Sequence, residues 1–305
     1  MKKLILIISL GFVFGRLSAQ TESIFNHYLT NPILINPGAA GFNDEYQLSA
    51  HARLQWTGFP DAPKTYMAMY NGPIGKTFGL GIGVLSEDAA QMTRLRLQLN
   101  YAFRFTIKKD WKFAFGFFTE WQNMDVDNAI SAGTFYDAGD QTLEDFLNGR
   151  SQFDAAIGGY GSFRDDTYFG LTFNNLVKNR LAAIQVADNG SFFQYYTFNL
   201  GHKFYLDELN LTLEPSMLLR QIRDVPFMMD INLKAGFLDD QLITGLSYRS
   251  LGWLGILLGT KFNGFKLYYS YDLSFQRFQT FNTGSHEVSI ALALKRKNKE
   301  VNKGY

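Results

Sequence analysis

The sequence predicts an all-β protein: a transmembrane antiparallel β-barrel of about 14 strands, with an N-terminal segment that plugs its lumen. Three observations support this fold. Apolar and polar residues alternate with a period of two along most of the chain, the N-terminus has the composition of a secretory signal peptide, and short and long connections alternate between the predicted strands.

Residues 1–19 form the predicted signal peptide, with cleavage near Ala19. Lys2 and Lys3 precede an apolar run that ends at Phe14. The run is too short to cross a bilayer as a helix, and no later stretch reaches about 20 apolar residues. Membrane insertion of the mature chain is therefore expected to use β-strands. There is no cysteine, so neither a lipid anchor on cysteine nor a disulfide framework is expected.

Residues 20–45 form an N-terminal segment without strand alternation. Asn31-Pro32 and Asn36-Pro37 predict turns, and apolar residues stand between and before them. A barrel of about fourteen strands has a lumen wider than its own side chains can fill. We therefore expect this segment to enter from the periplasmic side, to fold into or beneath the barrel as a plug, and to leave the chain a poor ion conductor.

The two predicted strands between Arg94 and Gln122 show the alternation most clearly. Trp111 and Trp121 bracket the apolar stripe of the second strand. Ten residues of a tilted strand rise on the order of 25 Å, which is the height of the apolar band of a membrane barrel. Both tryptophans are thus predicted to lie at membrane interfaces, in contact with outer-membrane lipid. A soluble β-sandwich would show the same alternation, so these strands alone leave both folds open.

The same pattern predicts the rest of a barrel domain over residues 46–295. The further strands are expected at 46–56, 64–71, 77–86, 151–163, 166–174, 192–205, 209–222, 226–238, 241–249, 252–261, 264–276 and 285–295. Residues 296–305 follow as a basic tail on the periplasmic side, which is expected to be either a solvated terminus or a contact for an acidic partner or for anionic head groups.

The connections decide between the two folds. Every second connection is a short polar turn, and those between them include the longer segments 57–63, 87–92, 125–150, 175–191 and 277–284. Outer-membrane barrels have short periplasmic turns and long extracellular loops. A soluble sandwich has no reason to sort its loops in this way, so the membrane barrel is favoured.

Composition agrees with a barrel that has a polar lumen. Aromatic residues make up 16% of the chain, yet the mean hydropathy is only −0.12. The formal net charge is +1, and loss of three basic residues with the signal peptide makes it −2. No electrostatic basis for nucleic-acid binding remains.

The polar faces of the strands carry charges of both signs, which we interpret mainly as a solvated or mutually paired lumen. Ser49 and His51 point the same way on one strand, but the sequence shows no third partner for a catalytic triad. There is no HExxH motif and no cysteine ligand, so no metal site, cofactor or catalytic residue is predicted. Gly79, Gly81 and Gly83 lie within a strand and are expected to thin the barrel wall rather than to bind phosphate.

Motifs along the whole chain resemble the PorP/SprF family of outer-membrane proteins, which belongs to type IX secretion and gliding motility in Bacteroidetes. The N-terminal motif comprises Phe25, Tyr28, Asn31, Pro32, Asn36, Pro37 and Gly41, and the first hairpin carries Arg53, Gln55, Trp56, Gly58, Ala62, Pro63 and Thr65. Later matches are Pro215-Ser216, the stretches 246–249 and 269–272, which includes Tyr271 and Asp272, and 284–287, which includes His286 and Glu287.

The resemblance implies a non-enzymatic barrel that assists export or cell-surface anchoring of a secreted, adhesin-like protein with a C-terminal sorting domain. Other type IX secretion components are the further implied partners. The loop at 125–150, with apolar residues such as Phe135 and Tyr136, and the loop at 175–191 are candidate contact surfaces. The main alternative is an outer-membrane diffusion channel, and a barrel enzyme ranks third.

Overall fold

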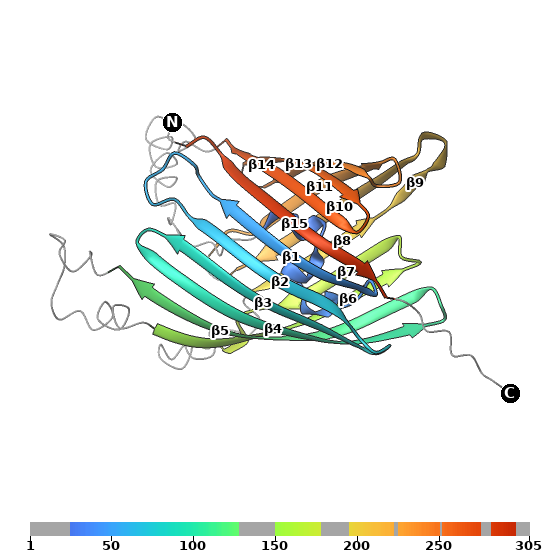
Figure 1. The fold of residues 1–305 in the computed structure, drawn as a ribbon, viewed down its shortest axis with the longest axis horizontal. Coiled ribbons are helices and arrows are strands. Elements are labelled where there is room, and N and C mark those ends of the chain that lie inside the picture. Colours follow the sequence, from blue (N-terminus) through green and yellow to red (C-terminus); the bar gives the residue numbers. More distant parts are fainter. Residues whose placement is uncertain are drawn as a thin grey trace, which may run out of the picture.

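The computed structural model describes residues 25–127, 150–177, 195–222, 225–250, 252–275 and 282–296. These residues form a closed antiparallel barrel around a short irregular segment (Figure 1). The strands are β1 (Glu45–Leu54), β2 (Lys64–Ile74), β3 (Phe78–Ala89), β4 (Met92–Ile107), β5 (Trp111–Val126), β6 (Arg150–Phe163), β7 (Thr167–Phe173), β8 (Tyr196–His202), β9 (Phe204–Leu206), β10 (Leu211–Gln221), β11 (Met228–Phe237), β12 (Leu242–Arg249), β13 (Trp253–Phe262), β14 (Phe265–Ser274) and β15 (Ser285–Lys295).

The barrel wall has fourteen strand positions, as the sequence predicts, and we call each position a stave. β8 and β9 are separated only by Lys203 and both pair with β10, so they form one interrupted stave. Each stave pairs with its neighbours in sequence, and β1 closes the barrel by pairing with β15 over ten residue pairs from Glu45–Lys295 to Leu54–His286. The predicted strand limits differ from the observed ones by a few residues. The prediction of a longer connection at 87–92 is wrong, because β3 and β4 extend into it and leave a two-residue turn, Ala90–Gln91, with positive φ at both residues.

The distribution of polar side chains is the reverse of that in a soluble protein. Glu120, Gln122 and Glu287 are buried on the inner face, whereas Phe115 and Phe153 on the outer face are 65% and 68% exposed. This inversion excludes the soluble sandwich and fits a barrel whose outer face meets lipid.

One rim of the barrel, the short-turn rim, carries the predicted tight turns. Non-glycine residues with positive φ occur in these turns, including Lys108, Lys109, Asp165 and Asp240. Such conformations match the twist of two-residue and three-residue hairpins. The opposite rim, the long-loop rim, carries the connections 128–149 and 178–194, which lie outside the described residues together with 1–24 and 297–305.

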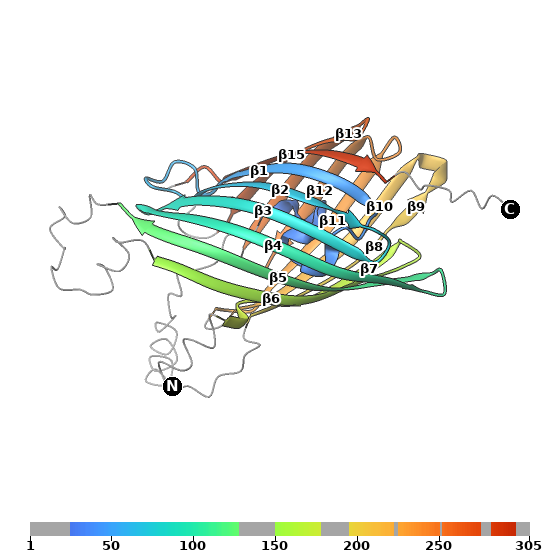
Figure 2. The same cartoon turned by 60° about the horizontal axis from the view of Figure 1, so that its bottom comes forward.

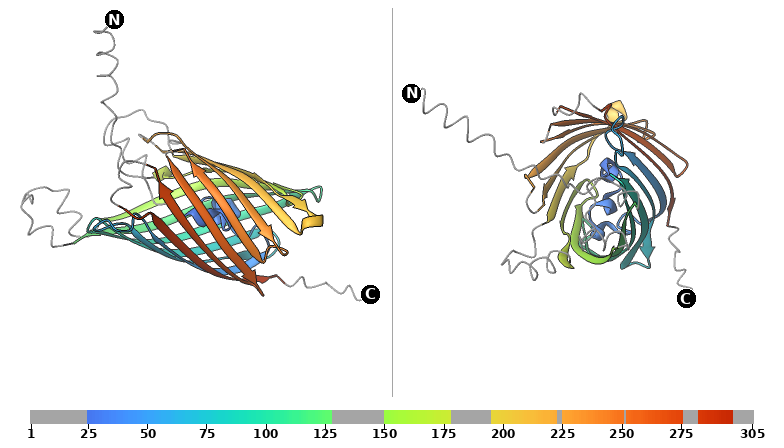
Figure 3. Two further views of the ribbon diagram at one scale, coloured as in Figure 1. Left: turned by 90° about the horizontal axis from the view of Figure 1, so that it is seen from above. Right: turned by 90° about the vertical axis from the view of Figure 1, so that its left-hand side faces the viewer.

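The N-terminal segment lies inside the barrel (Figures 2 and 3). It contains three 3-10 turns, η1 (Asn26–Leu29), η2 (Pro32–Leu34) and η3 (Pro37–Ala39), and proline begins the second and the third. Within the described residues, no helix is long and apolar enough to cross a membrane. We call residues 25–44 the plug, because they lie inside the lumen, as the sequence predicts.

Apolar side chains anchor the plug to three parts of the wall, one of which is the contact of Leu29 with Ile243, Leu257 and Tyr268. Phe25, Ile33, Ala39, Ala40 and Phe42 pack against inward-facing residues of β2 to β6, which are Met67, Met69, Leu85, Ala102, Ala114 and Tyr160. Tyr28 and Ile35 pack against Leu218 on β10. The plug therefore closes a hydrophobic core inside a lumen that is otherwise lined by polar groups.

Inward-facing glycines make room for the plug backbone. A Cβ atom on Gly79 would collide with the carbonyl of Ala40, and one on Gly116 with the backbone of Pro37 and Gly38. Gly81 instead makes room for the tip of the Ile33 side chain. The glycines of β3 thus thin the wall, as the sequence predicts, and at Gly79 and Gly81 the reason is close approach of the plug.

The plug connects to β1 at the short-turn rim. The Arg104 guanidinium binds the Gly41 carbonyl and the Asp44 carboxylate, and the Arg296 amide donates to the Asp44 carbonyl. From there the plug extends back through the lumen to Asn26 and His27, which meet the long-loop half of β14 and β15. The described segment thus runs from the long-loop half of the lumen to the short-turn rim, and its entry from the periplasmic side stays a prediction.

The two bracketing tryptophans lie on the outer face. Trp111 is 38% exposed and stacks on Phe113 with ring centroids 5.7 Å apart. Trp121 pairs across strands with Leu97 and Phe153, both of which are exposed. Their position is compatible with contact to lipid, and their role as interface anchors stays a prediction.

A valine at Gly116 is expected to displace the plug, because its side chain would occupy the space of the Pro37–Gly38 backbone. Overpacking of this kind costs about 1–3 kcal/mol, so the melting temperature should fall and proteases should cut within residues 25–44. Gly159→Val on β6 is the control, since a Cβ there meets only Phe115 at 3.8 Å. Equal stability of the two variants would contradict the tight fit.

Candidate functional site

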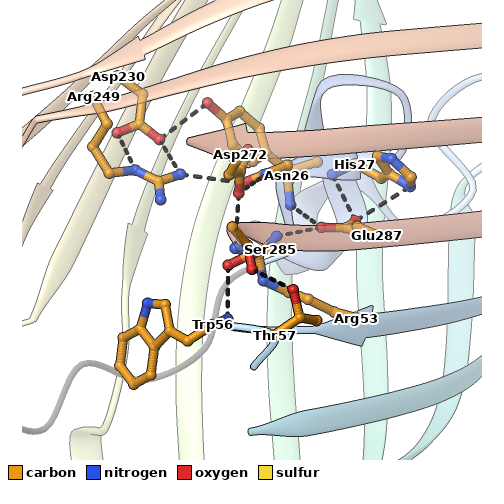
Figure 4. A network of polar contacts seen from close by, with 12 residues as sticks. Asn26, His27, Arg53, Trp56, Thr57, Asp230, Arg249, Asp272, Ser285 and Glu287 are labelled. Carbon is orange, nitrogen blue, oxygen red and sulfur yellow. Dashed lines mark hydrogen bonds and ion pairs between the residues drawn. The ribbon is translucent and has the colours of Figure 1, made fainter. Parts of the chain in front are cut away.

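A buried polar cluster joins the plug to the strands that close the barrel (Figure 4). We call it the seam cluster; it comprises Asn26, His27, Arg53, Asp272 and Glu287. Arg53 on β1 and Glu287 on β15 are directly paired across the closing seam. Asp272 projects inward from β14, the next stave. Strand alternation therefore places these three side chains on the inner face.

Arg53 holds two carboxylates with one guanidinium. Its Nη1 donates to Glu287 Oε2 and its Nη2 to Asp272 Oδ2, both at 2.9 Å. Arg53 is 3% exposed and Glu287 is fully buried. A planar guanidinium suits this role because its N–H groups point in fixed directions.

The plug donates to the same carboxylates. The backbone amides of Asn26 and His27 donate to Glu287 Oε2 at 2.7 Å and Oε1 at 3.0 Å, and Asn26 Nδ2 donates to Asp272 Oδ2 at 2.5 Å. Glu287 thus links the first strand, the last strand and the plug.

A second ion pair extends the seam cluster across the lumen. Arg249 on β12 donates through Nε and Nη2 to the two carboxylate oxygens of Asp230 on β11, at 2.9 and 3.0 Å. Arg249 Nη2 also donates to Asn26 Oδ1 at 3.2 Å, and Asn232 Nδ2 donates to the Tyr28 hydroxyl at 3.0 Å. The plug is therefore tied to β11 and β12 as well as to the seam.

Burial keeps the titratable plug residues of this region uncharged. Loss of hydration lowers the pKa of the His27 imidazole, although the nearby Glu287 carboxylate opposes this shift. Burial also raises the pKa of the Tyr28 hydroxyl, with a smaller contribution from the Asp230 charge. At neutral pH the His27 imidazole and the Tyr28 hydroxyl are thus uncharged, and the charged groups of this region are side chains of the barrel wall, such as Glu287 and Asp230.

The asparagine–proline motif fastens the other end of the plug. Asn36 Oδ1 accepts from the Gly38 amide at 2.8 Å, and Asn36 Nδ2 donates to the Gly159 carbonyl of β6 at 2.9 Å. Gly41 has a φ of 62° and its amide donates to Asn71 Oδ1 at 2.7 Å. Asn31, Pro32 and Pro37 belong to the same plug turns, where Asn31 and Pro37 are buried.

The remaining motif residues of the first hairpin lie mainly at the long-loop rim. The Trp56 amide donates to Ser285 Oγ at 3.1 Å, and the Gln55 amide donates to the Pro63 carbonyl at 2.9 Å. Gly58 has a φ of 97°, which glycine adopts without strain. These contacts order the rim above the seam cluster.

Three other sequence candidates occupy different positions. Thr65 is buried opposite Arg53 on β2, and the Tyr271 hydroxyl donates to the Thr283 carbonyl at 2.8 Å. His286 lies outside the seam cluster, 2.8 Å from the Tyr269 hydroxyl. The structure thus brings together Arg53, Asp272 and Glu287 and leaves His286 apart.

Sequence reasoning missed Asn26 and His27. Both precede the first asparagine–proline turn, where no alternation assigns a side chain to a face. The only signal was their place inside the N-terminal motif, between Phe25 and Tyr28.

The Ser49–His51 pair does not have the arrangement of a hydrolase. His51 Nε2 lies 3.2 Å from Ser49 Oγ, but both residues are buried and the Phe25 ring covers His51 with its centroid 5.4 Å away. His51 Nδ1 finds no hydrogen-bond partner among the described residues, so no carboxylate orients the ring.

One group of described side chains has the types and spacing of metal ligands, although the sequence predicts none. His27, His51 and Glu287 each offer one ligand atom, and these atoms lie within 4.8 Å of one another. They come from the plug, β1 and β15, so their proximity depends on the closed fold.

A polar chamber of about 370 Å³ lies between the plug and the short-turn rim. Its lining includes Lys234, Lys261 and Lys266, which are paired with Glu214 at 2.9 Å, Asp240 at 3.4 Å and Glu45 at 3.0 Å. The plug residues Tyr28, Pro32 and Ile35 also line the chamber. It can hold water and small ions, with the plug forming part of its wall.

Comparison with known proteins gives a family and a fold. Residues 17–292 match the model of the family described as type IX secretion system membrane protein PorP/SprF. No curated protein matches the sequence.

Among solved structures, a mutant of the monoaromatic hydrocarbon channel TodX has a TM-score of 0.50 at 10% identity, covering 88% of this chain and 94% of that chain. TodX of Pseudomonas putida, a toluene transporter, has a TM-score of 0.48 at 9% identity, with 88% and 92% covered. KdgM porin has a TM-score of 0.42 at 9% identity, with 81% and 99% covered. At such low identity the similarity concerns the barrel fold alone.

Replacement of Arg53 by methionine is expected to destabilise the barrel by about 3–5 kcal/mol, because it leaves Asp272 and Glu287 buried without their shared cation. Urea unfolding in detergent micelles measures this loss. Arg164→Met is the control: its partner Asp110 lies 3.6 Å away and both side chains are at least half exposed, so about 1 kcal/mol or less is expected. Equal losses would show that the seam cluster contributes no more than a surface pair.

Proposed function

The chain belongs to the PorP/SprF family of type IX secretion system membrane proteins, and from this premise we propose that it assists export or cell-surface anchoring of a secreted protein with a C-terminal sorting domain. The family is one of membrane proteins, and the closed barrel exposes apolar side chains on its outer face, so the chain is an outer-membrane protein. In this proposal the barrel acts by binding partners and carries out no catalysis.

The observation that supports this role best is the plugged lumen. The plug is held by the seam cluster, by an apolar core against β2 to β6 and by Arg104. Free diffusion requires an open lumen, whereas these plug contacts hold a folded segment across it. The surfaces that remain for function are the two rims and the outer face.

The two rims suit different partners in this proposal. The long-loop rim is ordered by the contacts of Trp56, Thr57 and Ser285, and from it extend the connections 128–149 and 178–194. We propose that these loops receive the secreted protein outside the cell. The short-turn rim and the basic residues after Lys295 would face other secretion components in the periplasm.

A diffusion channel is the second candidate, because the polar chamber of about 370 Å³ occupies the short-turn half of the lumen. Ion conductance distinguishes the two roles.

Planar-bilayer recordings are expected to show poor conductance for the intact chain and open-pore conductance after deletion of residues 20–42, since the plug obstructs the lumen. The intact protein from the same preparation is the control. An intact chain that already conducts like an open porin would contradict the plugged state and favour the channel.

Affinity purification from gently solubilised outer membranes, followed by mass spectrometry, tests the anchoring role. The tagged chain should retain a large secreted protein bearing a C-terminal sorting domain, together with secretion components. Two matched variants locate the contacts: replacement of residues 128–149 by a short turn should release the secreted protein only, and truncation of residues 297–305 should release periplasmic components only. Recovery of the barrel alone from all three samples would contradict the proposed role.

A further inference from the structure

Two histidines and a glutamate converge where the plug meets the closing seam. His27 comes from η1, His51 from β1 and Glu287 from β15, and one ligand atom of each lies within 4.8 Å of the other two. Their exposed fractions are 0%, 5% and 0%. Two imidazoles and one carboxylate are a common protein ligand set for zinc.

Both imidazole rings are held in the way that metal-binding histidines are held. His27 Nδ1 lies 2.7 Å from Ser289 Oγ, and His51 Nε2 lies 3.2 Å from Ser49 Oγ. The second nitrogen of each ring, His27 Nε2 and His51 Nδ1, is buried without a hydrogen-bond partner among the described residues. In metal sites an outer hydrogen bond fixes the ring and its tautomer, while the ring's other nitrogen binds the ion.

Each oxygen of Glu287 already has two polar neighbours, and Oε1 is the one that lies beside the His27 imidazole. Oε2 is occupied by Arg53 Nη1 and by the Asn26 amide, whereas Oε1 accepts the His27 amide and lies 3.2 Å from His27 Nδ1. Ligand atoms bound to one zinc ion at about 2.0–2.2 Å lie roughly 3.4 Å apart in a tetrahedron. Binding through the unpartnered His27 Nε2, rather than through Nδ1, requires the imidazole ring and the Glu287 carboxylate to rotate until their ligand atoms reach this spacing.

The local charges also permit a cation. Arg53 is shared between Glu287 and Asp272, so this side of the seam carries one more negative than positive charge. Arg249 is engaged by Asp230 on the other side of Asn26. A divalent ion would therefore enter an environment in which carboxylates outnumber cations.

We propose that His27, His51 and Glu287 bind a divalent transition-metal ion, for which zinc fits the ligand set best. The ion clamps the plug to the first and last strands. Since the three ligands come together only in the closed barrel with its plug in place, metal binding stabilises that state over any open one.

The test uses the full mature chain, folded in detergent and purified without a histidine tag. After dialysis against Zn²⁺ and then against metal-free buffer, elemental analysis should find about one zinc per chain. Co²⁺ titration should give the visible absorption of a site with nitrogen and oxygen ligands. EDTA should lower the melting temperature, and added Zn²⁺ should restore it.

Variants assign the ligands. His27→Ala and His51→Ala should abolish stoichiometric binding, whereas His202→Ala and His286→Ala, at the chain's other two histidines, should retain it. Ser49→Ala and Ser289→Ala should weaken Co²⁺ binding by about 10–100-fold, the usual effect of removing an outer hydrogen bond.

Two results would overturn the proposal. The first is an unaltered chain that holds no stoichiometric metal and melts at the same temperature with EDTA and with Zn²⁺. The second is a His27→Ala/His51→Ala double variant that still binds one ion. The measurements on the unaltered chain do not depend on any variant folding, and neither result bears on the anchoring role.

Discussion

The carboxylate of Glu287 is the constraint on which the closed structure depends. It is fully buried, and it accepts hydrogen bonds from Arg53 and from the backbone amides of Asn26 and His27. A buried charge is tolerated only when it is paired and hydrogen-bonded. Glu287 reaches this state only when β1 lies beside β15 and the plug is in the lumen, so barrel closure and plug docking satisfy the same group.

This dependence explains why the plug is built from such different contacts at its two ends. At the seam its amides and the Asn26 side chain complete the hydrogen bonding of wall charges. Near η3 its backbone packs into a wall thinned at Gly79 and Gly116, where any side chain would collide. Completion of buried hydrogen bonds is thus most prominent at the seam, whereas near η3 a close steric fit adds to the hydrogen bonds of Asn36 and Gly41. A lumen filled in this way leaves the rims as the natural places for partners, in keeping with a role in secretion rather than free diffusion.

Most of the barrel is predictable from the sequence because strand alternation has a period of two and one face must meet lipid. Successive side chains of a strand point to opposite faces, so Phe115 lies on the outer face and Glu120, five positions later, on the inner face. The same rule assigns Arg53, Asp272 and Glu287 to the lumen. Turn chemistry and loop length then determine which rim is which. The plug is predictable in outline, because two asparagine–proline turns with apolar neighbours do not fit any strand and a wide lumen needs filling. The single residue Lys203 that interrupts the stave of β8 and β9 could not be predicted, since the alternation continues on both sides of it.

The sequence by itself determined the fold class, the number of staves and the inward or outward direction of each strand residue, because these follow from local periodicity. Only the tertiary structure decided which inward residues meet. His27, His51 and Glu287 are separated by up to 260 positions, and they converge because the barrel closes β15 onto β1 around the plug. Proximity of this kind depends on strand register and on the path of a segment without periodicity, and neither is encoded in a local pattern. The fold could thus be predicted residue by residue, whereas the seam cluster became visible only when the two ends of the chain were brought together.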